Sequence, residues 1–525
     1  MKNYINCVRM KKVLITLVFL LAILSYSEGQ QIRTIKIDFK QEKGLFNESF
    51  KECVGAGRAN EGLRADWQEQ LRIVKKECGF KYIRFHGIFH DDMGVYTEKE
   101  DGTPVYNWQY VDKLYDFLVE IGMKPFVELS FTPSALASGD KTVFWWKSNV
   151  TPPKSFDKYS KFIKAFTKHL TERYGENEVK TWYFEVWNEP NHPSFFTGNK
   201  ADYLKMYQYA VKAVKSVSSD YRVGGPATSG CGWIPSFLNY CYDHTLPVDF
   251  VSTHAYNVHG GLDEFGKKQL KMDRSPNSVI NGVKYVAKKI KESDFHSLEL
   301  HFTEWSSSYS PADPVHDTYQ NASYVLNTLK NVEGKANSMS YWVFTDIFEE
   351  PGVPVTPFHG GFGLMNLQGI KKPTYFAYHY LNQLGNIELV NSDSSSWACR
   401  RGNDVQLLIW DMTYPAQGKE FNKVYFRRDH PAKQKGIVNI TVKNMVNGKY
   451  NFEIFQTGYR HNDSFTAYFD MGLPSQLTRK QVQSLKEISD DQPIKSERIR
   501  IKNGKMETSL NLNENDIYLI KLSKI

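Results

Sequence analysis

The sequence predicts an α/β protein in which a (β/α)8 TIM barrel is followed by a C-terminal antiparallel β-sandwich. Two observations support this fold class. Eight short apolar runs of strand length alternate with amphipathic segments of helix length between Cys53 and about Leu381, an order typical of a parallel barrel. Beyond Leu381 the helical period fades, and short runs alternate apolar with polar residues as the strands of a sandwich do.

Length and composition indicate a globular protein of two or three domains. The chain has 525 residues, of which 41% are hydrophobic and 24% charged. Aromatic residues make up 14%; most must be core, but the bias also suits a carbohydrate site because sugar rings stack on aromatic side chains. The net charge of +8 is modest and the basic residues are scattered, which argues against a nucleic-acid partner.

The N-terminus has the layout of a secretory signal peptide over residues 1–29. Four basic residues precede an apolar run from Val13 to Leu24, and small or polar residues follow it. That run is too short to span a bilayer, and no other stretch approaches 18 apolar residues. We therefore expect no membrane span, and export to the periplasm or out of the cell.

A single strand precedes the barrel. Residues 30–50 contain the alternating run Ile32–Phe39, which we expect to join the sandwich at the far end of the chain. Residues 51–383 form the expected barrel, with strands at Cys53–Gly57, Tyr82–His86, Pro125–Leu129, Trp182–Trp187, Arg222–Pro226, Phe250–His254, Leu298–Thr303 and Ser340–Phe344. The amphipathic segments between them predict helices at Ala65–Lys76, Trp108–Ile121, Phe156–Arg173, Lys200–Ser218, Ser278–Glu292 and Tyr319–Val332.

The expected sandwich covers residues 384–525. Its strands are predicted at Val405–Trp410, Ile437–Val442, Asn451–Phe455, Arg498–Ile501 and Ile517–Leu522. A stretch near residues 474–494 is rich in Gln, Ser and Lys, and it predicts an inserted helix instead of a strand.

The cysteines indicate neither a disulfide framework nor a metal site. Cys7 lies in the expected signal peptide, and the other five are sparse and odd in number. Cys231 and Cys241 could pair across the loop between them, but two buried free thiols are the favoured alternative. No spacing resembles a metal site, and no cofactor is expected.

Two strand ends carry the chemistry. The apolar run Trp182–Trp187 stops at Asn188-Glu189-Pro190, and the run Leu298–Thr303 stops at Glu304-Trp305. In a parallel barrel these ends meet at one face, where barrel enzymes keep their active sites. Two carboxyl groups there, beside aromatic rings, are what a glycosidic-bond hydrolase needs. Glu189 is the candidate acid/base, Glu304 the candidate nucleophile, and Asn188 a candidate donor to a sugar hydroxyl.

A set of motifs between about Val54 and Gly363 resembles glycoside hydrolase family 39, and most of all its β-xylosidases. The motifs are Gly55-Ala56-Gly57-Arg58, Tyr82 to Gly87, Asp91-Asp92, Phe184 to Asn191, Thr253 to Tyr256, Thr303-Glu304-Trp305 and Trp342 to Glu350. The resemblance implies a retaining mechanism and a barrel followed by a β-sandwich. It also implies a sugar pocket lined by His86, Asn188, Phe195, His254, Tyr256, Trp342, Glu349 and Glu350.

Glu349 and Glu350 bear on the charge of the substrate. As a loop pair they are either solvated or folded over the site. In the second case they would accept hydrogen bonds from sugar hydroxyls and repel a sugar that carries a carboxylate. We therefore expect a neutral oligosaccharide or glycoside as the substrate.

The leading hypothesis is an exported, retaining, exo-acting β-xylosidase that releases xylose from the non-reducing end of xylo-oligosaccharides. A retaining enzyme requires the Glu189 and Glu304 carboxyl groups to lie about 5–5.5 Å apart. One alternative is another exo- or endo-glycosidase of the same family, such as an α-L-iduronidase. Another is a carbohydrate-binding protein that has lost catalysis, although such a binder has no need for a matched pair of Glu residues. The sequence gives no indication of oligomeric state.

Overall fold

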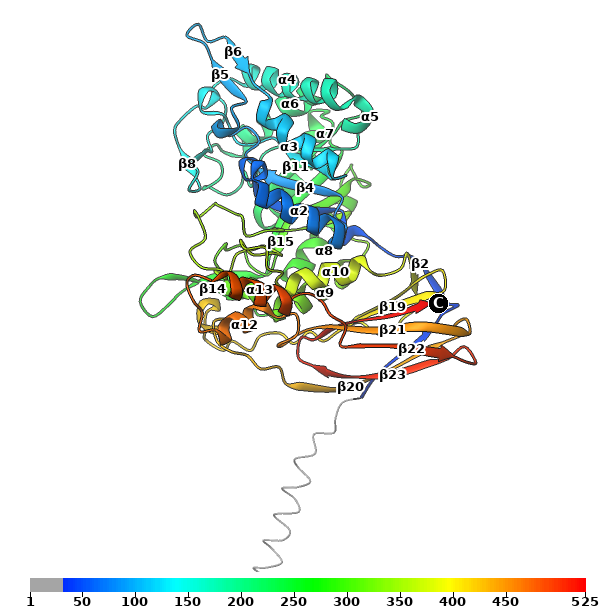
Figure 1. The fold of residues 1–525 in the computed structure, drawn as a ribbon. Helices are drawn as coiled ribbons and strands as arrows, with labels where there is room; N and C mark the ends of the chain where they lie inside the picture. Colours follow the sequence, from blue (N-terminus) through cyan, green and yellow to red (C-terminus); the bar gives the residue numbers. More distant parts are fainter. Residues whose placement is uncertain (1–31) are drawn as a thin grey trace, which may run out of the picture.

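A computed structural model describes residues 32–525, so the signal peptide expected at residues 1–29 lies outside the described residues. Eight parallel strands close into a barrel in the order β10-β11-β12-β15-β16-β3-β4-β7. The barrel lies in the upper part of Figure 1, with the C-terminal sheets below it. The predicted fold class is confirmed, and each predicted run overlaps one of these strands. Their bounds are β3 Cys53–Arg58, β4 Tyr82–His86, β7 Lys124–Glu128, β10 Tyr183–Glu185, β11 Arg222–Thr228, β12 Phe250–Tyr256, β15 Glu299–Ser306 and β16 Ser338–Tyr341.

Helices surround the barrel, each with its apolar face turned to the strands. Six lie where the sequence predicts them: α2 Ala65–Cys78, α3 Gln109–Glu120, α4 Phe156–Tyr174, α6 Lys200–Lys215, α8 Ser278–Lys291 and α9 Tyr319–Val332. Three more were not predicted: α5 Glu176–Val179, α7 Ile234–Asp243 and α10 Pro373–Asn382. The helix α10 is buried along almost its whole length, which removes the amphipathic pattern by which a surface helix is recognised.

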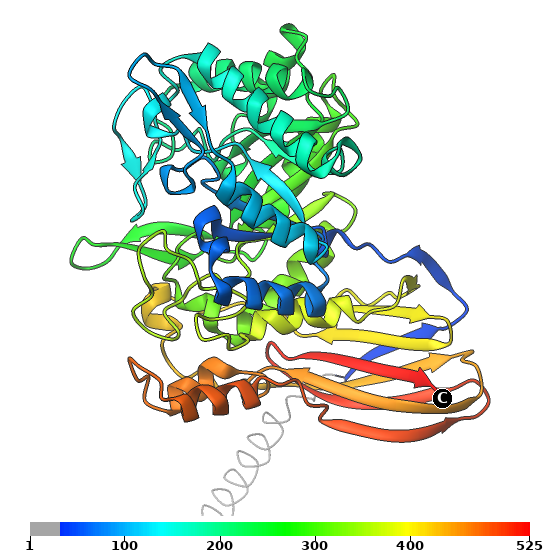
Figure 2. The same cartoon turned by 45° about the horizontal axis from the view of Figure 1, so that its top comes forward.

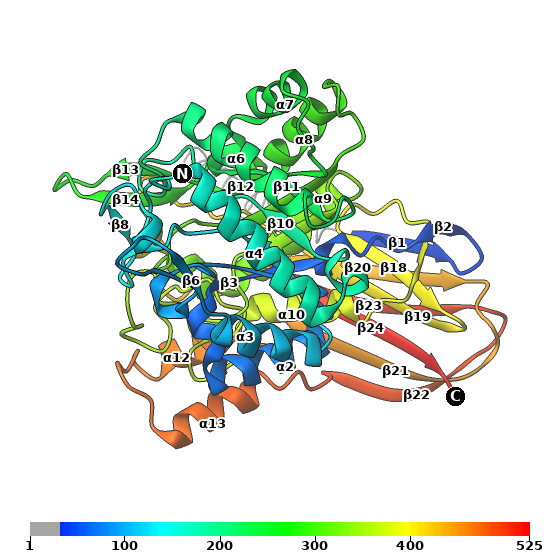
Figure 3. The ribbon, with the colours of Figure 1, turned by 90° about the horizontal axis from the view of Figure 1, so that it is seen from above.

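Three small hairpins lie after barrel strands, at the face where the carboxyl ends of the strands emerge. They are β5 Tyr96–Glu98 with β6 Pro104–Tyr106, β8 Thr142–Val143 with β9 Ser148–Asn149, and β13 Val258–Leu262 with β14 Lys268–Met272. The last of them projects beyond the barrel (Figure 3). These hairpins surround the site described below.

The C-terminal region is built from two sheets. One has seven strands in the order β2-β17-β18-β19-β24-β21-β22, and the other has three in the order β1-β20-β23. The blue N-terminal strands form one edge of each sheet, β2 beside β17 and β1 beside β20 (Figure 2). The bounds are β1 Ile32–Asp38, β2 Glu42–Leu45, β17 Ile387–Leu389, β18 Ser396–Arg401, β19 Asp404–Trp410, β20 Gln434–Lys443, β21 Gly448–Thr457, β22 Lys495–Ile501, β23 Met506–Asn513 and β24 Ile517–Lys524.

Helical segments interrupt this region. The short helix α11 Asn422–Tyr425 lies against β14, and α12 Ser464–Asp470 and α13 Arg479–Ile488 pack on each other. Phe358 and Ile370 of the loop after β16 pack against Phe465 and Leu485 of these helices, so they cover part of the barrel. No helix among residues 32–525 is long and apolar enough to cross a membrane, and the five cysteines in this part of the chain are free thiols.

The strand β1 is a structural part of the sandwich although 395 or more residues separate it from its partner strand. It pairs in parallel with β20, where Ile35 lies opposite Ile440 and Ile37 opposite Val442. Ile35 and Ile37 are buried in the apolar core between the two sheets, whereas Lys36 between them is exposed. The apolar residues of the alternating run therefore face the core, and the polar residues between them face solvent.

We expect Ile37→Ala to lower the free energy of unfolding by about 2–5 kcal/mol, because it removes buried methyl groups and leaves a cavity. Lys36→Ala is the matched control on the same strand and should change it by less than about 0.5 kcal/mol. Urea unfolding followed by circular dichroism measures both. Equal effects of the two substitutions would show that β1 does not contribute to the core.

Candidate active site

A buried arginine lies at the centre of the barrel. Arg84 of β4 is fully buried and donates to Glu185 Oε2 at 2.6 Å, Glu304 Oε1 at 2.7 Å and Asn188 Oδ1 at 3.0 Å. It is also ion-paired with Glu128 at 2.6 Å. Burial disfavours the guanidinium charge, but these carboxylates outweigh it and hold the pKa of Arg84 well above its usual range. One cation thus fixes side chains from three other strand ends.

Glu304 is held through both of its carboxylate oxygens. Oε1 accepts from Arg84, and Oε2 accepts from the Tyr256 hydroxyl at 2.8 Å. The side chain is 7% exposed. Glu304 lies within β15 rather than just after the strand, as the sequence analysis had it, because pairing with β12 continues to Ser306. This position gives it a rigid backbone.

Glu189 lies after β10, on a turn with unusual backbone angles. The strand β10 is shorter than the predicted run, and Trp187 and Glu189 both have positive φ, at 73° and 44°. Positive φ is unfavourable for a residue with a side chain, and it persists where surrounding contacts enforce it. Asn191 supplies these contacts: its side chain accepts from the Ser229 amide and donates to the Ser229 carbonyl, both at 2.9 Å. The turn therefore aims Glu189 at the barrel axis.

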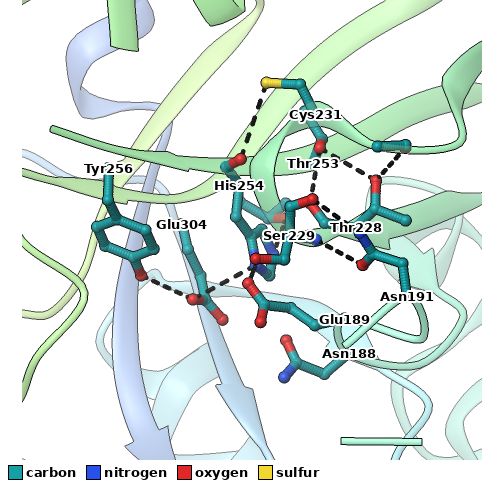
Figure 4. Close-up of polar contacts among 12 residues, drawn as sticks. Asn188, Glu189, Asn191, Thr228, Ser229, Cys231, Thr253, His254, Tyr256 and Glu304 are labelled. Carbon is teal, nitrogen blue, oxygen red and sulfur yellow. Dashed lines mark hydrogen bonds and ion pairs between the residues drawn. The ribbon is translucent and has the colours of Figure 1, made fainter. Parts of the chain in front are cut away.

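The two candidate catalytic carboxyl groups face each other. One oxygen of Glu189 and one of Glu304 lie within 4.8 Å of each other, and both approach the His254 ring (Figure 4). Burial raises the pKa of Glu189 to about 7, although His192 and Arg84 oppose the shift. A carboxyl group with this pKa can hold a proton near neutrality, as a general acid must.

His254 links the pair and fixes the place of a proton. Its Nδ1 lies 2.9 Å from Glu189 Oε1, and its Nε2 lies 3.2 Å from the Thr303 hydroxyl. Burial lowers the pKa of His254 to about 4, so the ring is neutral at pH 7. The Thr303 hydroxyl donates to Glu185 at 2.8 Å and must accept from Nε2–H. Nδ1 is then an acceptor, and the protonated carboxyl of Glu189 is its donor.

His86, Trp342 and Glu350 form a wall on the other side of Glu304. The His86 ring lies 4.8 Å from the Trp342 ring, and its Nε2 lies 3.4 Å from Glu350. Burial disfavours the charged ring, but Glu128, Glu350 and Glu304 outweigh it and raise the pKa of His86 to about 10. Gly55 makes room for this wall, because a Cβ there would lie 2.4 Å from the Trp342 ring.

The remaining predicted residues take different places. Asn188 accepts from Arg84 through Oδ1, so its amide nitrogen is left as a hydrogen-bond donor. Phe195 lies at the outer edge, with its ring 5.5 Å from that of Phe144. Glu349 is engaged by Arg64 at 2.9 Å and by Arg58 at 3.2 Å. Its carboxylate is thus already paired, whereas Glu350 faces His86.

Several functional residues were not found from the sequence. Arg84, Glu128 and Glu185 lie inside buried strands, where unpaired charge is very costly. Charged residues within apolar strands are therefore a signal of an ion cluster, and this signal could have identified them. Phe144, which stacks on His86 with ring centroids 5.9 Å apart, lies in a loop and gives no such signal.

Glu189, His254 and Glu304 also offer a possible metal site, since each has one ligand atom within 4.8 Å of the others. The surroundings of these side chains are unsuited to binding a metal ion. Glu304 is already paired with the Arg84 guanidinium, which would repel a cation. The three side chains instead satisfy one another as hydrogen-bond partners, and the arrangement suits proton transfer and nucleophilic attack on a sugar.

Known proteins resemble this chain over most of its length. The family model described as "Glycosyl hydrolases family 39" matches residues 33–506. A β-xylosidase of Geobacillus stearothermophilus is 38% identical, over 91% of this chain and 94% of the relative, and one of Caldicellulosiruptor saccharolyticus is 37% identical, over 90% and 94%.

The solved structure of a monomeric β-xylosidase from Caulobacter crescentus is also similar. It superposes with a TM-score of 0.92 and 41% identity, covering 94% of this chain and all of the other. The model match extends over far more than half of the chain, and these relatives are aligned over almost their whole lengths. The chain belongs to glycosyl hydrolase family 39.

Proposed function

We propose that this chain is a retaining, exo-acting β-xylosidase that releases xylose from the non-reducing end of short xylo-oligosaccharides. The observation that carries the proposal is the approach of the Glu189 and Glu304 carboxyl oxygens to within 4.8 Å. An inverting enzyme needs about 6.5–9.5 Å between the carboxyl groups to admit a water molecule. Relatives named β-xylosidases, aligned over nearly the whole chain, support xylose as the sugar.

The reaction takes two displacements at one carbon. A Glu304 oxygen attacks the anomeric carbon while Glu189 gives its proton to the departing glycosidic oxygen, which leaves a sugar ester on Glu304. Glu189, now a carboxylate, takes a proton from water, and the water oxygen attacks the same carbon and releases Glu304. The Asn188 amide donates to a sugar hydroxyl throughout, and Arg84 fixes its orientation.

Exo action is supported by the closed wall beyond His86. The backbone N–H of Trp145 donates to the carbonyl of Glu350 at 2.8 Å, which ties the β8–β9 hairpin to the loop after β16. His86, Phe144 and Trp146 stack behind this contact. A sugar chain therefore cannot continue past the terminal ring on this side.

A panel of chromogenic substrates tests the proposal. Nitrophenyl β-xyloside should be hydrolysed with a much higher kcat/KM than the corresponding β-glucoside, α-L-arabinoside or α-L-iduronide. Preference for the iduronide would overturn the neutral-sugar assignment, and no hydrolysis of any of the four would favour a protein that only binds carbohydrate.

We also propose that the chain is exported, because residues 1–29 have the pattern of a signal peptide. N-terminal sequencing of the protein from the periplasm and the culture medium tests this. A mature chain beginning near residue 30 is expected, and an intact N-terminus retained in the cytoplasm would contradict it.

Glu304→Ala should abolish turnover of every substrate, because no ester can form. Glu189→Ala should still cleave a dinitrophenyl xyloside, whose leaving group needs no proton, and added azide should raise its rate by replacing the water that needs a base. Steady-state kinetics on substrates of graded leaving-group acidity measure this. If both variants depend alike on leaving-group acidity, the two roles are assigned wrongly.

The kcat/KM of the enzyme should fall as pH rises through about 7. Glu189 must be protonated to act as an acid, and its raised pKa of about 7 places the loss of that proton there. In Glu189→Ala, assayed with the dinitrophenyl xyloside, this fall of kcat/KM at alkaline pH should disappear. If the same fall persists in the variant, another group controls it.

Glu350→Gln should lower kcat/KM for the xyloside roughly ten- to hundred-fold, because it weakens a charge-assisted hydrogen bond worth about 1.5–3 kcal/mol. Glu349→Gln is the adjacent control. Since the Glu349 carboxylate already contacts Arg58 and Arg64, it should change thermal stability more than kcat/KM. The reverse order of effects on kcat/KM would place Glu349, not Glu350, against the sugar.

A further inference from the structure

A second cavity lies between the β13–β14 hairpin and the loop after β15 and plays no part in the mechanism above. Its volume is about 680 Å³, within the range of about 300–1,000 Å³ typical of ligand sites. Its lining includes Gly260, Gly261, Lys268, Tyr309, Asp313 and Lys423. These residues come from the β13–β14 hairpin, from the loop after β15 and from α11.

Tyr309 connects this cavity to the nucleophile. Its ring packs edge-on against that of Tyr256, with centroids 6.2 Å apart, and the Tyr256 hydroxyl donates to Glu304 Oε2 at 2.8 Å. The Tyr309 ring thus lies between the cavity and Tyr256, which is the residue that holds Glu304. Tyr309 is 49% exposed, so part of its ring is free to stack on a sugar.

The order of the barrel strands places the cavity opposite the closed wall. The hairpin that lines it follows β12, whereas His86 ends β4, and these two strands lie four places apart in the ring of eight. Glu304 on β15 and Glu189 after β10 lie between them. If the terminal xylose lies against His86 and Trp342, the leaving group must depart on the other side, toward Tyr309.

A buried polar network holds the cavity in its open shape. The side chain of Asn422 on α11 donates to Asp313 at 2.7 Å and accepts from the Met272 amide at 3.0 Å and from Gln417 at 2.8 Å. These bonds join a segment from beyond the barrel to the base of the hairpin and to the loop after β15. A preformed site loses less freedom on binding than a mobile one.

We propose that this cavity binds the leaving-group part of the substrate, namely the further sugar units of a neutral xylo-oligosaccharide. Tyr309 supplies a stacking face, Gly260 leaves room beside the backbone, and Lys268 and Lys423 provide hydrogen-bond donors to hydroxyl groups. The C-terminal region thereby contributes to substrate binding through α11. This proposal rests on the proposed β-xylosidase function.

Kinetics as a function of chain length test the proposal. We expect kcat/KM of the wild-type enzyme to rise by at least about tenfold from xylobiose to xylotetraose. Tyr309→Ala should remove most of that rise, measured as the ratio of kcat/KM for xylotetraose to kcat/KM for xylobiose. Tyr285→Ala, at a tyrosine of similar exposure (44% against 49%) on helix α8, is the control and should leave that ratio unchanged.

A second variant avoids the contact with Tyr256. A Cβ at Gly260 would have one neighbour within 4 Å, the Tyr309 hydroxyl at 4.0 Å, so Gly260→Leu adds bulk to the cavity and should also lower the rise in kcat/KM with chain length. A wild-type enzyme that cleaves the nitrophenyl xyloside but shows no dependence on chain length would overturn this inference and leave the proposed function standing. No cleavage of any xyloside would overturn both.

Discussion

The burial of one positive charge at the centre of the barrel constrains most of the active site. Arg84 has no exposed surface and contacts Glu128, Glu185 and Glu304. A buried charge without partners is very costly, and so is a carboxylate without a cation. With His86 also charged, two cations face four carboxylates, because Glu350 contacts His86. These cations are engaged by other carboxylates, and burial raises the pKa of Glu189 to about 7.

The same constraint assigns different roles to two chemically identical side chains. Glu304 is ion-paired and hydrogen-bonded through both oxygens, whereas Glu189 approaches a neutral imidazole. The neutrality of His254 follows from its burial, and its tautomer follows from the Thr303 hydroxyl, which already donates to Glu185. The proposed nucleophile and the proposed acid thus differ in their surroundings, and the cluster must be considered as one unit.

Around this centre the barrel rim is asymmetric. Aromatic rings and the contact between Trp145 and Glu350 close the side above β4 and β7, while the side above β12 and β15 opens to a cavity. This asymmetry suits the proposed exo action, in which the site holds the end of a sugar chain and the rest extends outward. The hairpins that shape the two sides are β8–β9 on the closed side and β13–β14 on the open side. They carry little sequence pattern, because their shape depends on contacts made across the fold.

The sequence was most informative where periodicity and strand ends decide the structure. The barrel strands, the two catalytic candidates and the alternating strand β1 could all be predicted in this way. Other features depend on distant partners that no local pattern reveals. The pairing of Glu349 with Arg58 and Arg64 is one example, and the buried helix α10 is another. Trp187 and Glu189 adopt positive φ angles that depend on tertiary contacts, among them the Asn191 side chain and the bond from the Glu189 amide to the Ala227 carbonyl.

The central claim is that Glu304 attacks the sugar directly and Glu189 acts as acid and then as base. The most direct measurement is the configuration of the first product, followed by proton NMR in the first minutes of hydrolysis of an aryl β-xyloside. Two displacements predict that β-xylose forms first and converts to the α-anomer only by mutarotation. Initial formation of α-xylose would mean a single displacement by water and would contradict the account.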